Sequence, residues 1–143
     1  MEDTHILFAV EHGVAYLTVN RPEQRNAMTW EMYQRLVEIC ERVDEDDALK
    51  VLVIRGSGER AFISGTDISQ FPAFRGDPRA GIAYEERIDH VVGRLEAVGK
   101  PTLASIRGYA LGGGLGIALA CDLRLASDDA RFGVPVIRLG NCL

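Results

Sequence analysis

Three consecutive glycines, Gly112–Gly114, form the segment of this sequence best suited to hold a negative charge. They follow the apolar stretch Thr102–Ile106, which is typical of a strand, and precede Leu115–Cys121, which is typical of an apolar helix. A strand–glycine–helix order leaves backbone N–H groups unpaired at the positive end of a helix. Such groups bind either a phosphate or an oxygen that becomes charged during a reaction.

Two phosphate-binding motifs with similar glycine spacing fail on these residues. A P-loop requires Lys and then Ser or Thr where this chain has Gly114 and Leu115. A dinucleotide-binding turn begins correctly at Gly112 and Gly114 but needs a third glycine where Ile117 stands. Two interpretations remain: an oxyanion site, or glycines that only allow a helix to pack closely on a strand.

A second small-residue turn, Ser64–Asp67, follows the apolar residues Phe62 and Ile63. Gly65 precedes a predicted helix start at Asp67, so this turn also offers a backbone N–H. Two N–H groups from separate turns that converge on one oxygen would polarise a thioester or ester carbonyl. They would hold an enolate or a tetrahedral oxyanion more strongly, because charge grows on that oxygen during the reaction.

The elements that must position these turns predict a mixed α/β fold with one domain over residues 1–143. Thr29 is the predicted N-cap of a helix whose apolar residues recur at helical spacing from Trp30 to Val43. Further helices are expected over 88–98 and 115–121, and residues 71–81, which hold Pro, Gly and Arg, are interpreted as a mobile loop. The expected strands are 6–10, 14–19, 51–55, 102–106, 123–126 and 131–133.

Composition and charge exclude several classes of function. Of the 143 residues 47% are apolar and 26% are charged, which is ordinary for a globular protein, and the net charge of −5 disfavours nucleic acid as a partner. We expect no signal peptide, no membrane span and a cytoplasmic location. Cys40, Cys121 and Cys142 show no metal-ligand spacing, so no metal site is expected, and the first two are predicted buried thiols.

Four segments, taken in order, resemble the crotonase superfamily, which is the enoyl-CoA hydratase/isomerase family. They are Asn20–Ala27, Ala61–Ile68, Lys100–Thr102 and Gly108–Asp122. The resemblance covers essentially the whole chain and implies a spiral of ββα repeats. It also implies that these residues form only the N-terminal core, because members of the family continue into a C-terminal helical region used in trimer packing.

The resemblance places the oxyanion-hole donors at the N–H groups of Thr66 and Gly113. It implies an acyl-CoA thioester as the substrate, with coenzyme A as part of that substrate and no other cofactor. It further implies fatty acid metabolism and a homotrimer or hexamer in the full-length form. The residues it assigns to coenzyme A or substrate binding are Arg25, Ala27, Ser64, Gly65, Thr66, Asp67, Ile68 and Gly113. Asp67 is alternatively an N-cap with a structural role.

The sequence departs from the family at two positions where its hydratases carry glutamates. These positions hold Gly116 and Val136, neither of which can accept or deliver a proton. Water addition needs a base and an acid, so isomerisation, decarboxylation or hydrolysis is expected rather than hydration by the usual mechanism. A non-catalytic acyl-CoA-binding or assembly subunit is the alternative.

Two other side chains are candidates for the missing chemistry. His90 lies beside the apolar stripe of its predicted helix and is either near the acyl pocket or a surface histidine. Cys142 follows Gly140 and Asn141, where the 4-chlorobenzoyl-CoA dehalogenase branch of the family has its aspartate nucleophile. It is either a thiolate nucleophile or a packed apolar residue.

Overall fold

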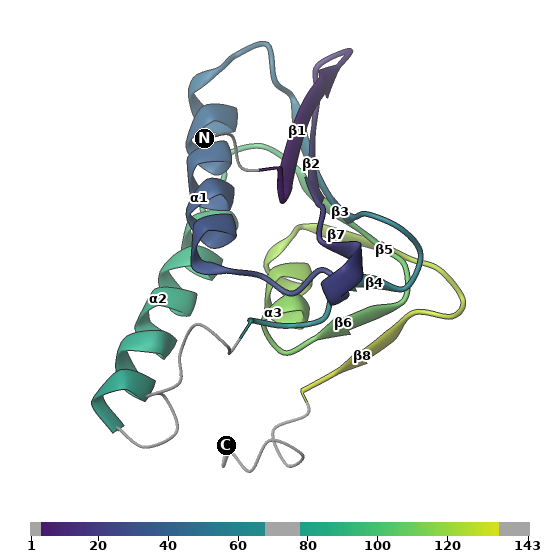
Figure 1. Ribbon diagram of the computed structural model, residues 1–143. Coiled ribbons are helices and arrows are strands. Elements are labelled where there is room, and N and C mark those ends of the chain that lie inside the picture. The colour runs from purple at the N-terminus through teal and green to yellow at the C-terminus, as the bar shows by residue number, and fades with distance from the viewer. Residues whose placement is uncertain (1–3, 68–77, 135–143) are drawn as a thin grey trace.

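The computed structural model describes residues 4–67 and 78–134 of the chain. Within these residues the strands form a larger and a smaller sheet, accompanied by three α-helices (Figure 1). The elements are β1 (Ile6–Glu11), β2 (Val14–Val19), the 3₁₀ turn Pro22–Gln24, α1 (Trp30–Glu45), β3 (Val51–Gly56), β4 (Ala61–Ile63), α2 (Pro78–Glu96), β5 (Thr102–Ile106), β6 (Tyr109–Leu111), α3 (Gly113–Ala120), β7 (Leu123–Ala126) and β8 (Arg131–Gly133).

The larger sheet has the strand order β1-β2-β3-β5-β7. β1 and β2 form the expected antiparallel hairpin, and each later strand pairs in parallel with the one before it. Alternate residues of β2, namely Ala15, Leu17 and Val19, are completely buried, because successive side chains of a strand point to opposite faces. One face of this sheet therefore packs against the hydrophobic core.

The smaller sheet, β4-β6-β8, is parallel throughout. From β3 onward the chain gives one strand to the larger sheet and the next strand to the smaller one. β4 is followed along the chain by α2, and β6 by α3. This repetition of two strands and a helix is the ββα spiral that the sequence motifs imply, so the fold expectation is confirmed.

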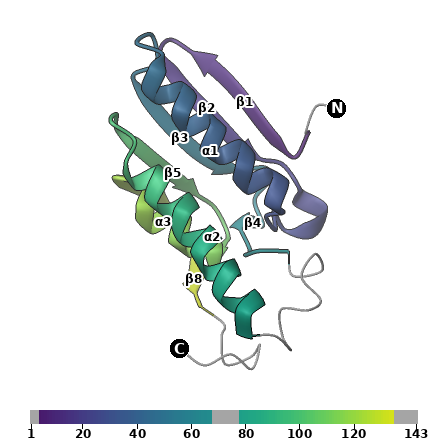
Figure 2. The ribbon, with the colours of Figure 1, turned by 90° about the vertical axis from the view of Figure 1, so that its left-hand side faces the viewer.

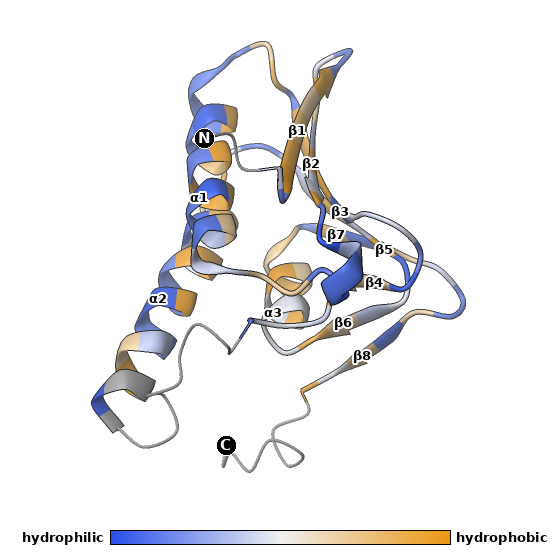
Figure 3. Ribbon diagram, viewed as in Figure 1, coloured by the Kyte–Doolittle hydropathy of each residue, from blue (hydrophilic) through white to orange (hydrophobic). Residues whose placement is uncertain are grey.

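The first helix forms where the capping residue and the apolar spacing predict it. Thr29 Oγ1 accepts a hydrogen bond from Met32 N at 3.3 Å, which satisfies one of the unpaired donors of the first turn. Tyr33, Leu36 and Cys40 lie on the buried face of α1. The apolar side of α1 faces the larger sheet, and α2 packs against α1 and α3 on the same side of the molecule (Figures 2 and 3). No helix within the described residues is long and apolar enough to cross a membrane.

The structure corrects the predicted boundaries of two helices. α2 begins at Pro78, so residues 78–81 of the expected loop are helical; a proline is tolerated in a first helical turn, where its missing N–H costs nothing. α3 begins at Gly113 rather than at Leu115. The helix start expected at Asp67 and the remainder of the expected loop reach into 68–77, outside the described residues.

Asp122, which follows α3, is hydrogen-bonded to the first residue of β5. Asp122 Oδ2 accepts hydrogen bonds from Thr102 N (2.9 Å) and Thr102 Oγ1 (3.3 Å), which ties the end of α3 to the start of β5. Cys40 and Cys121 are both buried free thiols, as predicted. Burial raises the pKa of Cys40 to about 12 and that of Cys121 to about 11, so both remain protonated and unreactive at neutral pH.

The carboxylate of Asp44 links the ends of α1 and α2. It accepts hydrogen bonds from Arg94 Nη2 (2.7 Å) and from Gly99 N (2.8 Å). Burial by itself raises the pKa of Asp44, but these two donors outweigh it and hold the pKa below its usual value. A carboxyl whose pKa is depressed in the folded state stabilises that state above its unfolded pKa and loses this contribution as the pH falls.

We therefore expect Asp44→Asn to lower the free energy of unfolding by about 1 kcal/mol at pH 7 and by much less at pH 3. Urea unfolding of both proteins at the two pH values measures the difference. Asp47→Asn is the matched control, because Asp47 is exposed and no hydrogen bond or ion pair holds its side chain in the described part of the chain. A pH-independent effect of Asp44→Asn would contradict the prediction.

Candidate functional site

The two glycine-containing turns leave the same end of the smaller sheet. β4 and β6 are parallel neighbours, so the residues that follow Ile63 and Leu111 emerge side by side at their carboxyl ends. This edge of a parallel sheet is where ligands commonly bind. A Cβ built on Gly65 would lie 3.7 Å from Leu111 O, and one built on Gly113 would lie 3.3 Å from Thr66 Oγ1. The structure thus brings Thr66 and Gly113, the two predicted donor residues, into contact distance.

The other side of the Ser64–Asp67 turn is held by the loop that precedes α1. Met28 N donates to Gly65 O, and Asp67 N donates to Met28 O, each at 2.8 Å. These bonds form a parallel bridge between Met28 and Thr66. In such a ladder the residue between the two bonded neighbours directs its own N–H to the opposite side. The bridge therefore leaves the Thr66 N–H pointing away from the loop.

The second predicted donor, Gly113, lies at the start of α3. Gly112 N donates to Gly133 O at 2.9 Å, and the helical bonds begin with Gly116 N donating to Gly112 O. Gly113 is the first residue of the helix, where an N–H has no partner within the helix. Neither Thr66 N nor Gly113 N donates a hydrogen bond to any group in residues 4–67 and 78–134. With respect to this part of the chain, both donors are unpaired.

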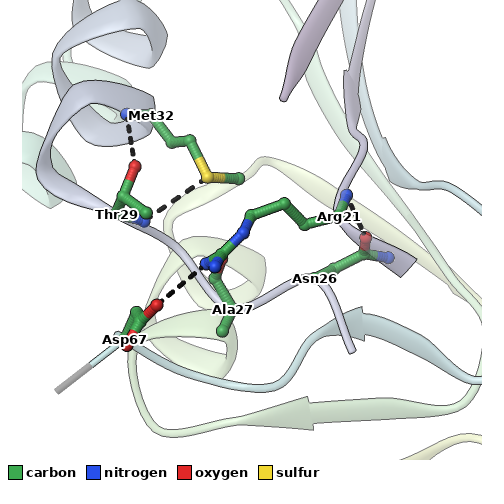
Figure 4. Close-up of polar contacts among 6 residues, drawn as sticks. All are labelled: Arg21, Asn26, Ala27, Thr29, Met32 and Asp67. Carbon is green, nitrogen blue, oxygen red and sulfur yellow. Dashed lines mark hydrogen bonds and ion pairs between the residues drawn. The ribbon is translucent and has the colours of Figure 1, made fainter. Parts of the chain in front are cut away.

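Asp67 is tied into the protein by an ion pair rather than left at the surface. Its Oδ2 lies 3.1 Å from Arg21 Nη1, which also donates to Ala27 O (Figure 4). The buried Asn26 amide accepts from Arg21 N at 2.8 Å and donates to Ala61 O at 2.8 Å. These contacts hold the loop of residues 21–27 against the turn, so Asp67 has a structural role in this part of the chain. Residue 68, which follows it, lies outside the described residues.

A hydroxyl cluster that the sequence patterns did not indicate surrounds the Thr66 side chain. Thr66 Oγ1 lies 2.7 Å from the Tyr33 hydroxyl and accepts a hydrogen bond from the Tyr84 hydroxyl at 2.8 Å. The ring of Trp30 packs beside both tyrosine rings, with centroid separations of 5.6 and 5.9 Å. Neither tyrosine belongs to a sequence motif: Tyr33 falls on the apolar stripe of α1, and the contacts of both tyrosines with Thr66 join segments distant in sequence.

The remaining predicted site residues fall in different places. A Cβ on Gly116 would meet Val92 Cγ2 of α2 at 3.8 Å, so this position faces α2 and has room for a Cβ. His90 is exposed on α2, as in the second of its two interpretations. Ile68, Val136 and Cys142 lie outside the described residues, and their assignments stay predictions.

An open groove of about 1240 Å³ runs beside the loop and the turn. Arg25 and Ser64, both assigned to coenzyme A binding, line it, and Ser64 N donates to Arg25 O at 3.2 Å. The groove brings together positive and negative side chains with backbone groups. Its other lining residues are Pro22, Glu23, Gln24, Glu59, Arg60, Gly108, Tyr109, Leu111, Asp129 and Arg131.

The ββα spiral, with two glycine turns facing each other at one sheet edge, defines a protein of the crotonase fold. The pattern of the enoyl-CoA hydratase/isomerase family matches residues 9–142. The chain belongs to this family.

Individual relatives agree with this membership. A short-chain-enoyl-CoA hydratase of Clostridium acetobutylicum is 34% identical over 98% of this chain and 53% of its own length. An (E)-benzylidenesuccinyl-CoA hydratase of Thauera aromatica is 39% identical over 95% of this chain and 52% of its own. The crystal structure of an enoyl-CoA hydratase/carnithine racemase from Magnetospirillum magneticum superposes with a TM-score of 0.91 at 32% identity, covering 99% of this chain and 53% of that one. The chain spans about half the length of these relatives.

Proposed function

We propose that the chain binds an acyl-CoA thioester and polarises its carbonyl between the N–H groups of Thr66 and Gly113. The carbonyl oxygen gains negative charge as an enolate forms, and two oriented N–H donors stabilise that charge more than they stabilise the neutral substrate. Coenzyme A enters as part of the substrate, and the chain supplies backbone dipoles rather than a further cofactor. The protein is then an enzyme that stabilises an enolate.

One observation carries this proposal: the two donor residues are in contact distance, yet neither N–H has an acceptor within the described part of the chain. A buried or half-buried N–H without a partner is unfavourable, so its retention at two facing turns needs a reason. An acceptor supplied by a substrate gives that reason. A helix N-terminus at Gly113 adds a favourable dipole for the same oxygen.

The loop and turn beside the hole are suited to the carrier part of the substrate. We assign Arg25, Ala27 and the Ser64–Gly65 turn to the adenine and pantetheine of coenzyme A, contacted largely through backbone groups. Arg25 and Ser64 border the groove described above, and the arginines in its lining would offset the charge of phosphate groups. The proposal includes a cytoplasmic protein that assembles as a homotrimer or hexamer and acts in fatty acid metabolism.

Gly116 decides which reactions we propose. Without a carboxylate at this position or at Val136, the ordinary acid–base pair for hydration is missing from this chain. Isomerisation, decarboxylation or hydrolysis is then the favoured reaction, since each can proceed from a polarised thioester or its enolate. The same observation favours a second candidate, an acyl-CoA-binding or assembly subunit with no turnover.

A screen of the full chain against enoyl-, malonyl- and aryl-CoA thioesters distinguishes the two candidates. We expect saturable binding of at least one thioester by calorimetry, competed by free coenzyme A, together with turnover detected by chromatography of the products. Binding without turnover of any thioester would support the binding subunit. Absence of binding to every thioester, in protein whose fold is verified by circular dichroism, would contradict both.

A further inference from the structure

The side chain of Thr66 bridges two helices that are separated in the sequence. Its Oγ1 lies 2.7 Å from the hydroxyl of Tyr33 on α1 and 2.8 Å from that of Tyr84 on α2. The hydrogen bond from Tyr84 uses one lone pair of Oγ1, which leaves the Thr66 proton and the other lone pair for Tyr33. All three hydroxyls can therefore be joined at once, and we call Tyr33, Thr66 and Tyr84 the hydroxyl bridge.

The hydroxyl bridge also contacts the second donor residue. A Cβ built on Gly113 would lie only 2.6 Å from the Tyr33 hydroxyl, so this hydroxyl occupies the space above the Gly113 Cα. Tyr33 is 1% exposed and cannot move aside without displacing its neighbours. The bridge thus touches both sides of the proposed oxyanion hole.

Thr66 is held through its backbone and through its side chain. Gly65, which precedes it, has a φ of +135°, a conformation reached through the wide freedom of glycine. On one side the backbone bonds to Met28 hold the turn, and the Thr66 N–H points away from Met28. The hydroxyl bridge adds a second attachment, through the Thr66 side chain, to the residue that bears the N–H.

The two tyrosine hydroxyls are suited to hold Thr66 as fixed neutral groups. Burial raises the pKa of Tyr33 and of Tyr84, more than the hydrogen bond with Thr66 lowers it, so both phenols keep their protons at neutral pH. Trp30 packs against both rings, and the guanidinium of Arg87 lies 5.2 Å from the Trp30 ring. This packing limits the positions of the two hydroxyls.

We propose that Tyr33 and Tyr84 are positioning residues that set the direction of the Thr66 N–H through the Thr66 hydroxyl. This inference rests on the proposed oxyanion hole and adds the residues that orient it. Its chemical consequence is specific: loss of the hydroxyl bridge weakens polarisation of a bound carbonyl while the contacts to the rest of the thioester remain. A loosely held donor loses much of its effect, because a small misplacement of a reacting group is costly.

The test uses hexadienoyl-CoA, a conjugated thioester whose absorption band moves to longer wavelength when its carbonyl is polarised. We expect a band shift with the wild-type full chain and a much smaller shift with Thr66→Val and with Tyr84→Phe, each of which removes one hydroxyl and little volume. The dissociation constant of the probe should change by less than about threefold, whereas turnover of any accepted thioester should fall about tenfold in kcat. Thr66→Ser, which restores the hydroxyl, should recover most of the shift.

Further variants separate positioning from folding. Thr66→Val combined with Tyr84→Phe should be no worse than the poorer single variant, because both remove the same interaction. Tyr16→Phe, which removes a hydroxyl on β2 away from the site, should leave the shift unchanged. Tyr33→Phe tests the contribution of the buried tyrosine. If Tyr33→Phe does not fold, Tyr84→Phe still tests the hydroxyl bridge.

Two different failures have different meanings. An unshifted band with bound probe in the wild-type protein would overturn the oxyanion hole, and with it the role of the bridge. A normal wild-type shift that persists undiminished in Thr66→Val and Tyr84→Phe would overturn only the positioning role and leave the hole in place.

Discussion

Replacing Thr66 with proline should lower kcat/KM for any thioester the protein turns over by about 10²–10³-fold relative to Thr66→Val. Proline has no backbone N–H, so one of the two proposed donors is lost outright. Valine lacks the hydroxyl but retains the N–H, so the comparison separates the backbone donor from the side chain. We expect most of the loss in kcat, because the donor acts most strongly when the oxygen carries charge. Steady-state kinetics below and above KM measure this division.

The fold should tolerate this proline better than most. In the described residues the Thr66 N–H donates to no protein group, while the bonds between the turn and Met28 involve the N–H of Asp67 and of Met28. Circular dichroism and a thermal unfolding midpoint near that of Thr66→Val would verify the fold. If a folded Thr66→Pro protein matched Thr66→Val in kcat/KM, the Thr66 N–H would not be an oxyanion donor.

Local patterns predicted the long elements of the fold because their physical causes lie within a few residues. The Thr29 cap and the apolar spacing after it define α1, and alternation defines β2. β6, with only the residues Tyr109–Leu111, was not predicted as a strand. Three residues carry too little periodicity, and its pairing with β4 depends on residues nearly fifty positions earlier in the chain.

In the candidate site, too, the features with a local cause could be predicted and those that depend on tertiary contacts could not. Gly65 and Gly112–Gly114 revealed the two turns, because glycine before a helix is a local signal, and the parallel pairing of β4 with β6 explains why the turns meet. The hydroxyl bridge had no such signal. Tyr33 reads as a core residue of α1 and Tyr84 as one aromatic residue near the start of α2, and only the tertiary structure brings both to Thr66.

Gly114→Ala should destabilise the protein by about 3 kcal/mol or more, which is a large part of the stability of a domain of this size. α3 lies so close to β4 that a Cβ on Gly114 would stand 2.2 Å from Ile63 O and 2.8 Å from Ile63 Cβ. Both neighbours are fixed, one in the backbone and one in the buried core, so the helix itself must move. Urea unfolding should show a lower midpoint with an unchanged slope.

Gly116→Ala is the matched control, two residues further along the same helix. Its Cβ would meet Val92 Cγ2 at 3.8 Å, an ordinary van der Waals contact, and alanine favours the helix over glycine by about 0.5–1 kcal/mol. We therefore expect this variant to be as stable as the wild type or slightly more stable. Equal losses in the two variants would show that the close approach of α3 to β4 is not what requires glycine at position 114. If the expected contrast is found, packing requires glycine at position 114 but not at position 116. The absence of a carboxylate at Gly116 then reflects the chemistry of the site and not a requirement of the fold.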